Sequence, residues 1–213
     1  MPLMLVVKDF IKKYNDQLVL DIPALTLNPG IYWVKGPNGS GKTSFFRSVS
    51  GIIPCKGTIS IDGVELNQSP TAYRRLINYA EAEPVLPAFL TGYELINFHN
   101  SAKAGEEKML DELIEYFVIK SFIRNPIGTY SSGMLKKLSV LLAFIGQPKV
   151  ILLDEPLITI EDTFLPRIYD LIKKQHKEKG TGFLISSHQA LNEEVIGHYQ
   201  TLQLANQTVT CTG

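Results

Sequence analysis

The sequence contains few cysteines, no excess charge of either sign and no long apolar run. Cys55 and Cys211 are the only cysteines among 213 residues, too few for a disulfide framework, and no cluster of cysteine and histidine indicates structural zinc. Lys plus Arg and Asp plus Glu each total 21, so net charge gives no reason to expect nucleic acid as a partner. No apolar run approaches the ~20 residues of a membrane span. We therefore expect a globular protein of the reducing cytoplasm.

The most informative pattern is an eight-residue run that fits G-x-x-x-x-G-K-[ST], a loop that wraps nucleotide phosphates. It consists of Gly36, Pro37, Asn38, Gly39, Ser40, Gly41, Lys42 and Thr43. Glycines let backbone N–H groups approach an anion, the lysine places a positive charge on the β- and γ-phosphates, and the threonine hydroxyl suits Mg²⁺. Residues 31–34 are typical of a buried strand before the loop, and residues 43–49 of a helix after it. The run therefore predicts a site for a nucleoside triphosphate with Mg²⁺.

A second chemical signal lies at the ends of two later apolar strands. Residues 150–153 form a continuous apolar run that ends in Asp154 and Glu155. Asp154 can hold the hydration shell of Mg²⁺ and Glu155 can orient or activate a water molecule, although both can also be solvated strand-end charges. His188, after the next apolar strand, can hydrogen-bond a γ-phosphate or be an ordinary loop histidine. Tyr14 can stack on a base or be a core or surface tyrosine.

The remaining patterns predict an α/β fold with two additions to a phosphate-loop core that contains a parallel sheet. Strands at residues 3–8, 18–22 and 58–61 indicate an N-terminal antiparallel β subdomain. An amphipathic helix at 106–119 and a second helix after Ser131-Ser132-Gly133 indicate an inserted helical subdomain. We expect residues 1–83 and 141–213 to form the core with its β subdomain, and residues 84–140 to form the helical insertion.

These elements, in this order and spacing, resemble the nucleotide-binding subunit of ATP-binding cassette (ABC) transporters over essentially the whole chain. Residues 36–43 match that family's phosphate loop, and residues 149–156 match its strand with metal aspartate and catalytic glutamate. Ser187-His188 matches its switch histidine, and residues 130–134 stand where the family has its Leu-Ser-Gly-Gly-Gln signature. Tyr14 falls at the position of the adenine-stacking aromatic.

The resemblance implies an ATPase with Glu155 and His188 as catalytic residues and ATP and Mg²⁺ as cofactors. Two copies would pair head to tail, with each ATP between one phosphate loop and the partner's Ser131, Ser132 and Gly133. A separate integral membrane subunit would use the cycle to transport a substrate. The chain would then lie in the cytoplasm, peripheral to the inner face of a membrane through that partner.

Three positions depart from the family pattern. Ala82 stands where the family has a glutamine that binds the metal, although Glu81 or Glu83 would serve if the register shifted. Ser132 stands at the first glycine of the signature. Residues 158–161, which end in Glu161, differ from the family's segment after the catalytic glutamate. These departures motivate an alternative, a nucleotide-regulated dimerisation module or a soluble ABC ATPase with slow hydrolysis. A GTPase is disfavoured because no Asn-Lys-x-Asp element is present.

Overall fold

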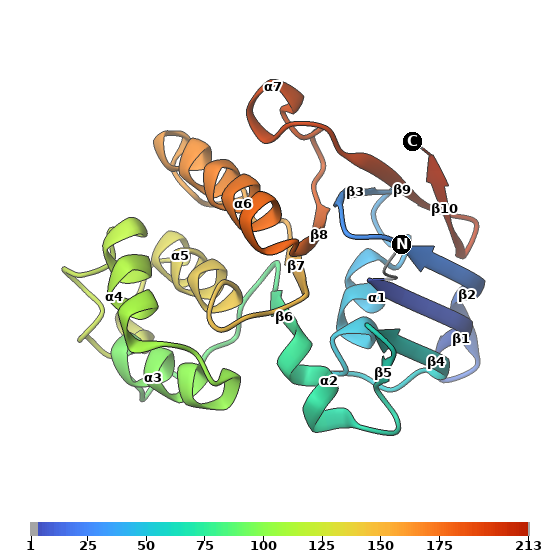
Figure 1. Ribbon diagram of the computed structural model, residues 1–213, viewed down its shortest axis with the longest axis horizontal. Helices are drawn as coiled ribbons and strands as arrows, with labels where there is room; N and C mark the ends of the chain where they lie inside the picture. Colours follow the sequence, from blue (N-terminus) through green and yellow to red (C-terminus); the bar gives the residue numbers. More distant parts are fainter. Residues whose placement is uncertain (1–3, 213) are drawn as a thin grey trace.

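The computed structural model describes residues 4–212 and contains two β-sheets, the larger of which is flanked by helices (Figure 1). The smaller sheet has strand order β2-β1-β4-β5, and each neighbouring pair is antiparallel. Its strands are β1 (Leu5–Tyr14), β2 (Gln17–Leu27), β4 (Lys56–Ile61) and β5 (Val64–Glu65). The predicted N-terminal antiparallel sheet is therefore confirmed.

The larger sheet has strand order β10-β9-β3-β8-β7-β6. It is parallel from β9 to β6, and the outer strand β10 runs antiparallel to β9. Its strands are β3 (Ile31–Lys35), β6 (Ile77–Ala80), β7 (Val150–Asp154), β8 (Gly182–Ser186), β9 (Gln200–Ala205) and β10 (Thr208–Thr212). This order brings the ends of β3, β8 and β7 together at one edge of the sheet, where loops after parallel strands form binding sites.

The helices fall into two groups around the larger sheet. Figure 1 shows α3, α4 and α5 together on the side away from the smaller sheet, whereas α1 lies beside that sheet. None of the helices within residues 4–212 is long and apolar enough to cross a membrane. The helices are α1 (Lys42–Val49), α2 (Pro70–Leu76), α3 (Gly92–Lys103), α4 (Glu107–Tyr116), η1 (Ile127–Thr129), α5 (Ser132–Ala143), η2 (Asp162–Phe164), α6 (Leu165–Lys179) and α7 (Glu193–Ile196).

The interior strand β7, which lies between β8 and β6, separates two hydrophobic cores. All five of its residues are buried, and successive side chains of a strand point to opposite faces of the sheet. Val150 and Leu152 belong to the cluster that contains Phe45 of α1, whereas Ile151 and Leu153 belong to the cluster built with α3 to α6. A continuous apolar run is therefore required here, because both faces of the strand are covered.

Most predicted elements are confirmed, with shifted ends. The strand expected at 3–8 begins at Leu5 and continues to Tyr14, and residue 3 lies outside the described residues. The helix expected at 106–119 is α4, and the one expected after the serine pair is α5. The helices α2, α3 and α7 and the strand β6 were not predicted from the sequence. α2, α7 and β6 are short, and α3 exposes Tyr93 and Phe98, which obscures its apolar stripe.

A pH-dependent stability is expected from His99 on α3. Its Nε2 is buried without a hydrogen-bond partner in the described part of the chain, and burial, together with the Lys103 ammonium, lowers the pKa of His99 to about 4. The unfolded chain binds this proton from about pH 6.5 downward while the folded protein does not, so stability falls between pH 6.5 and 4. This contribution reaches up to about 1.4 kcal/mol per pH unit.

Urea unfolding of the wild type and of His99→Leu over this pH range measures the effect. The variant should lose stability less steeply on acidification, because it has no imidazole to protonate. Parallel curves for the two proteins would show that His99 carries no such penalty.

Candidate functional site

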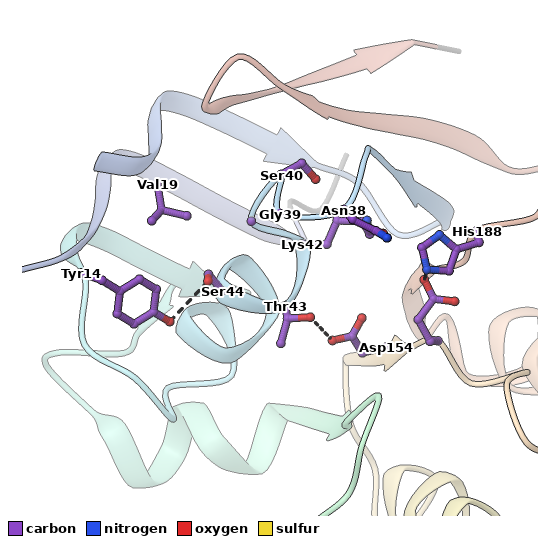
Figure 2. A pocket seen from close by; sticks show the side chains of 12 residues that line it. Tyr14, Val19, Asn38, Gly39, Ser40, Lys42, Thr43, Ser44, Asp154 and His188 are labelled. Atoms are coloured by element: carbon purple, nitrogen blue, oxygen red, sulfur yellow. Dashed lines mark hydrogen bonds and ion pairs between the residues drawn. The ribbon is translucent and has the colours of Figure 1, made fainter. Parts of the chain in front are cut away.

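The predicted phosphate loop connects β3 to α1 and borders a pocket of about 450 Å³ (Figure 2). The last six residues of the loop, 38–43, line this pocket, whereas Gly36 and Pro37 lie outside its lining. The Lys42 side chain folds back over the loop, where its Nζ donates to the carbonyl oxygens of Gly36 at 2.8 Å and Pro37 at 3.2 Å. Both acceptors are neutral, and an ammonium bonds an anionic oxygen more strongly. The lysine is therefore held ready for an anion in this pocket.

Two glycines of the loop are required by its geometry. Gly41 has a φ of 97°, in the left-handed region that glycine adopts without steric cost. A Cβ on Gly36 would lie 2.5 Å from the carbonyl oxygen of Leu204 in β9 and 2.6 Å from the Ser40 hydroxyl. The first glycine of the motif is thus needed because the neighbouring strand packs against the loop.

The Asp154 carboxylate is buried at this edge of the sheet and is held there by three hydrogen bonds. It is 1% exposed, and its Oδ2 accepts hydrogen bonds from Thr43 Oγ1 at 2.8 Å and Tyr79 OH at 3.1 Å. Its Oδ1 accepts a third from Ser186 Oγ at 2.5 Å. A buried carboxylate needs such donors to offset its loss of hydration. The three donors come from α1, β6 and β8, so this one side chain joins three elements to the end of β7.

Glu155 and His188 both line this pocket, and Figure 2 shows His188 at the end of the pocket near Asp154. His188 Nε2 lies 3.6 Å from Glu155 Oε1, and the histidine side chain is 54% exposed. Oε1 of Glu155 is buried and has no hydrogen-bond partner within residues 4–212. Glu155 also has a φ of 46°, which is uncommon outside glycine. A buried carboxylate oxygen without a donor, at the wall of a pocket, is chemically suited to accept a hydrogen bond from water.

Tyr14 lies at the opposite end of the pocket from His188, where Figure 2 also shows Val19. Its hydroxyl is 3.3 Å from Ser44 Oγ, and the ammonium of Lys12 lies 4.5 Å from its ring centroid. The side chain is 48% exposed. Of the interpretations left open by the sequence, a core tyrosine is therefore wrong, and a ring available for stacking fits the observed position.

The serine pair and Gly133 are not in this pocket. Ser131 is the N-cap of α5, where its side chain accepts from the backbone N–H of Met134 at 3.2 Å. Ser131 and Ser132 are exposed and Gly133 is half-buried. The N-terminus of α5, with its N–H groups and partial positive charge, therefore lies outside the pocket that the chain's own phosphate loop borders.

After β6, neither Glu81 nor Ala82 provides a side-chain ligand next to Asp154 in the described part of the chain. The carboxylate of Glu81 pairs with Arg47 of α1 at 3.6 Å, and Ala82 offers only its backbone carbonyl, which accepts from Lys136 at 3.0 Å. Burial lowers the pKa of Lys136 to about 8, although the carboxylates of Asp154 and Glu155 act in the opposite direction. Lys136, Tyr79 and Ser186 were not predicted as site residues, because folding brings each of them to the site from a distant part of the sequence.

The loop between β3 and α1, with Asp154 at the end of β7, defines a nucleotide-binding protein of the phosphate-loop class. The family model described as ABC transporter matches residues 20–158, which is more than half of the chain. The chain therefore belongs to the ABC transporter family, as an ATP-binding ATPase domain with the predicted α/β fold.

Individual relatives agree with this assignment. The Bacillus subtilis (strain 168) protein named Uncharacterized ABC transporter ATP-binding protein YhcH is 29% identical over 191 residues, which cover 88% of this chain and 63% of YhcH. The chain thus spans less than two thirds of that relative. A solved ATP-binding subunit of an ABC transporter is 26% identical with a TM-score of 0.88, covering 98% of this chain and 89% of that one. The dimeric ATP-binding cassette MJ0796, in a post-hydrolysis state bound to ADP and Pi, shares the fold at 20% identity with a TM-score of 0.80 and 98% coverage of both chains.

Removal of the Ser186 hydroxyl should destabilise the folded protein. This side chain is fully buried, donates to Asp154 and accepts from the Glu155 backbone N–H at 2.9 Å. Ser186→Ala leaves both partners unsatisfied, so the free energy of unfolding should fall by about 1–3 kcal/mol. Urea unfolding without nucleotide measures this loss.

Ser187→Ala is the matched control, since that hydroxyl accepts one bond from the Gln189 backbone and does not contact Asp154. It should lower the free energy of unfolding clearly less than Ser186→Ala does. Equal losses for the two variants would contradict the anchoring of Asp154 through Ser186.

Proposed function

We propose that this chain is the ATP-hydrolysing subunit of a transporter, and that it powers a separate membrane subunit. The observation that carries the proposal is the hydrogen bond of 2.8 Å between Thr43 and Asp154. It joins the phosphate loop to the strand end that also presents Glu155, so that loop, metal carboxylate and general base share one pocket wall. The family assignment supports the same function.

ATP binds in this proposal along the pocket from Tyr14 to the phosphate loop. The base stacks on the exposed ring of Tyr14, and the triphosphate lies against the N-terminus of α1. Lys42 exchanges the neutral carbonyls of Gly36 and Pro37 for the β- and γ-phosphates. The backbone of Asn38 to Gly41, exposed along the pocket, supplies further N–H groups.

The side chains of Thr43 and Asp154 would hold Mg²⁺. One carboxylate and one hydroxyl oxygen fit the oxygen ligands that Mg²⁺ takes in phosphate sites, where phosphate and water complete its shell. When bound, the ion would neutralise the charge that develops on the phosphate oxygens. Asp154 is buried and already accepts hydrogen bonds, so its carboxylate keeps its orientation without the ion.

Glu155 orients and activates the attacking water, and His188 contacts the γ-phosphate. The buried Oε1 of Glu155, which has no hydrogen-bond partner among the described residues, is the acceptor for a water proton. His188 lies 3.6 Å from that oxygen and is half-exposed, so its ring can turn toward a phosphate without unfolding of the loop. The presence or absence of the γ-phosphate can thereby affect the position of Glu155, the general base, through His188.

A second copy of the chain completes the site in a head-to-tail dimer. Ser131, Ser132 and Gly133 lie outside the pocket of their own chain, at the exposed N-terminus of α5. This N-terminus is an anion site that the partner's γ-phosphate can fill. The structural likeness to a dimeric cassette bound to ADP and Pi supports this pairing. The membrane subunit docks on this dimer and holds it at the inner, cytoplasmic face of the membrane.

Lys42→Ala should weaken ATP binding by about 10-fold or more, because charge-assisted hydrogen bonds to the phosphates are lost. Isothermal titration calorimetry with ATP and Mg²⁺ measures the dissociation constant. Lys35→Ala is the control, since the Lys35 ammonium lies over the Trp33 ring, 5.2 Å from its centroid, and outside the pocket lining. Equal affinity in Lys42→Ala and Lys35→Ala would refute binding at the phosphate loop.

Glu155→Gln should keep ATP affinity close to the wild-type value and reduce turnover by ~10²–10⁴-fold, as expected for loss of a general base. Phosphate release under saturating ATP measures turnover, and sedimentation velocity shows whether an ATP-dependent dimer accumulates. Glu193→Gln, which changes a surface carboxylate paired with His198, should leave both readouts unchanged. Wild-type turnover in Glu155→Gln would exclude Glu155 as the base.

A further inference from the structure

The Lys136 side chain forms a buried link between three segments of the chain. Lys136 lies on α5 and is 1% exposed. Its Nζ donates to the carbonyl oxygens of Glu81 at 2.8 Å, Ala82 at 3.0 Å and Asp154 at 2.9 Å. An ammonium group has three N–H donors, so these three carbonyls use its whole capacity.

The third of these bonds fixes the peptide between Asp154 and Glu155. The carbonyl oxygen of that peptide accepts from Lys136, and its N–H, which belongs to Glu155, donates to Ser186 Oγ at 2.9 Å. The peptide is therefore held from opposite sides by α5 and β8.

This doubly held peptide immediately precedes a strained backbone. Glu155 has a φ of 46°, and a left-handed conformation in a residue with a Cβ persists only where surrounding contacts enforce it. The conformation sets the direction of the Glu155 side chain, whose Oε1 lies 3.6 Å from His188 Nε2. Lys136 and Ser186 hold the peptide before this turn, and within the turn the Glu155 carbonyl oxygen accepts from the Ile158 backbone N–H at 3.4 Å.

We propose that Lys136 is a positioning residue for Glu155, which keeps its backbone in the conformation that aims the carboxylate at the attacking water. The same ammonium also bonds the carbonyl oxygens of residues 81 and 82. It therefore couples the Glu155 backbone conformation to two other parts of the chain, the segment that leads to α3 and the N-terminal part of α5. Ala82 has no polar side-chain atom, and the Glu81 carboxylate is paired with Arg47. The coupling therefore runs through backbone carbonyls and the lysine.

This inference rests on the proposed role of Glu155 and is tested in the full-length chain with Lys136→Met. The variant keeps the length of the side chain and removes all three donors. Because Lys42 and the phosphate loop remain intact, the dissociation constant for ATP should stay within about 3-fold of wild type, whereas kcat should fall by about 10- to 100-fold, as for a misplaced catalytic group. Lys136→Arg, which restores a cation and N–H donors, should recover part of kcat.

Lys103→Met is the matched control. Lys103 on α3 is a half-buried lysine whose pKa burial likewise lowers to about 8, and its Nζ donates to the backbone carbonyls of Arg74 and Ile77, not to the site. Its kcat should remain at the wild-type value even if its melting temperature falls. If Lys136→Met does not fold, Lys136→Gln allows the same comparison.

The outcomes separate the two proposals. The positioning role is overturned if Lys136→Met keeps the wild-type kcat, or if Lys136→Met and Lys103→Met lose kcat equally. In either case the proposed function still stands as long as Glu155→Gln hydrolyses ATP more slowly than the wild type. A loss of ATP affinity as large as the loss of kcat also overturns it, because Lys136 would then only support the fold. If Glu155→Gln hydrolyses ATP like the wild type, the proposed function fails first.

Discussion

The buried carboxylate of Asp154 is the constraint on which the rest of this structure depends. Its three hydroxyl donors, Thr43, Tyr79 and Ser186, come from three different elements and converge on the end of β7. A carboxylate that is 1% exposed is tolerated only with such donors. The start of α1 after the phosphate loop and the strands β6 and β8 are consequently held to the carboxylate at the end of β7.

The two hydrophobic cores explain why that charge lies where it does. β7 is covered on both faces, so its apolar residues continue until the chain leaves the sheet at Asp154. The first polar side chains thus fall at the carboxyl end of the strand, beside the loop after β3. The candidate site therefore lies at the edge of the sheet where the two cores end. The peptide after Asp154 is held there by Ser186 and Lys136.

Local patterns in the sequence predicted the parts of the site that depend on neighbours in the chain. The strand–loop–helix around Lys42, the strand ending in Asp154 and Glu155, and the capping of α5 by Ser131 all follow from spacing and residue type. Tyr79, Ser186 and Lys136 carried no local signal, because their partners lie 75, 32 and 18 residues away in the sequence, respectively.

The division at residues 84 and 140 stays a prediction, and α5 continues to Ala143. The placement of Glu155 and His188 beside the loop favours an active ATPase over a purely regulatory module.

The central claim is that one phosphate loop and the α5 N-terminus of a second copy form one ATP site. Mixing two variants, Lys42→Ala and Ser132→Glu, tests it most directly. A carboxylate at the first turn of α5 suits the helix dipole but repels a partner's γ-phosphate, and Lys42→Ala binds ATP weakly. At an ATP concentration near the wild-type dissociation constant, each variant alone should therefore have little activity. In a mixed dimer, the Ser132→Glu chain supplies an intact loop and the Lys42→Ala chain an intact helix N-terminus. The account predicts that the mixture hydrolyses ATP well above the sum of its components. A mixture no more active than that sum, beside an active wild type, would contradict it.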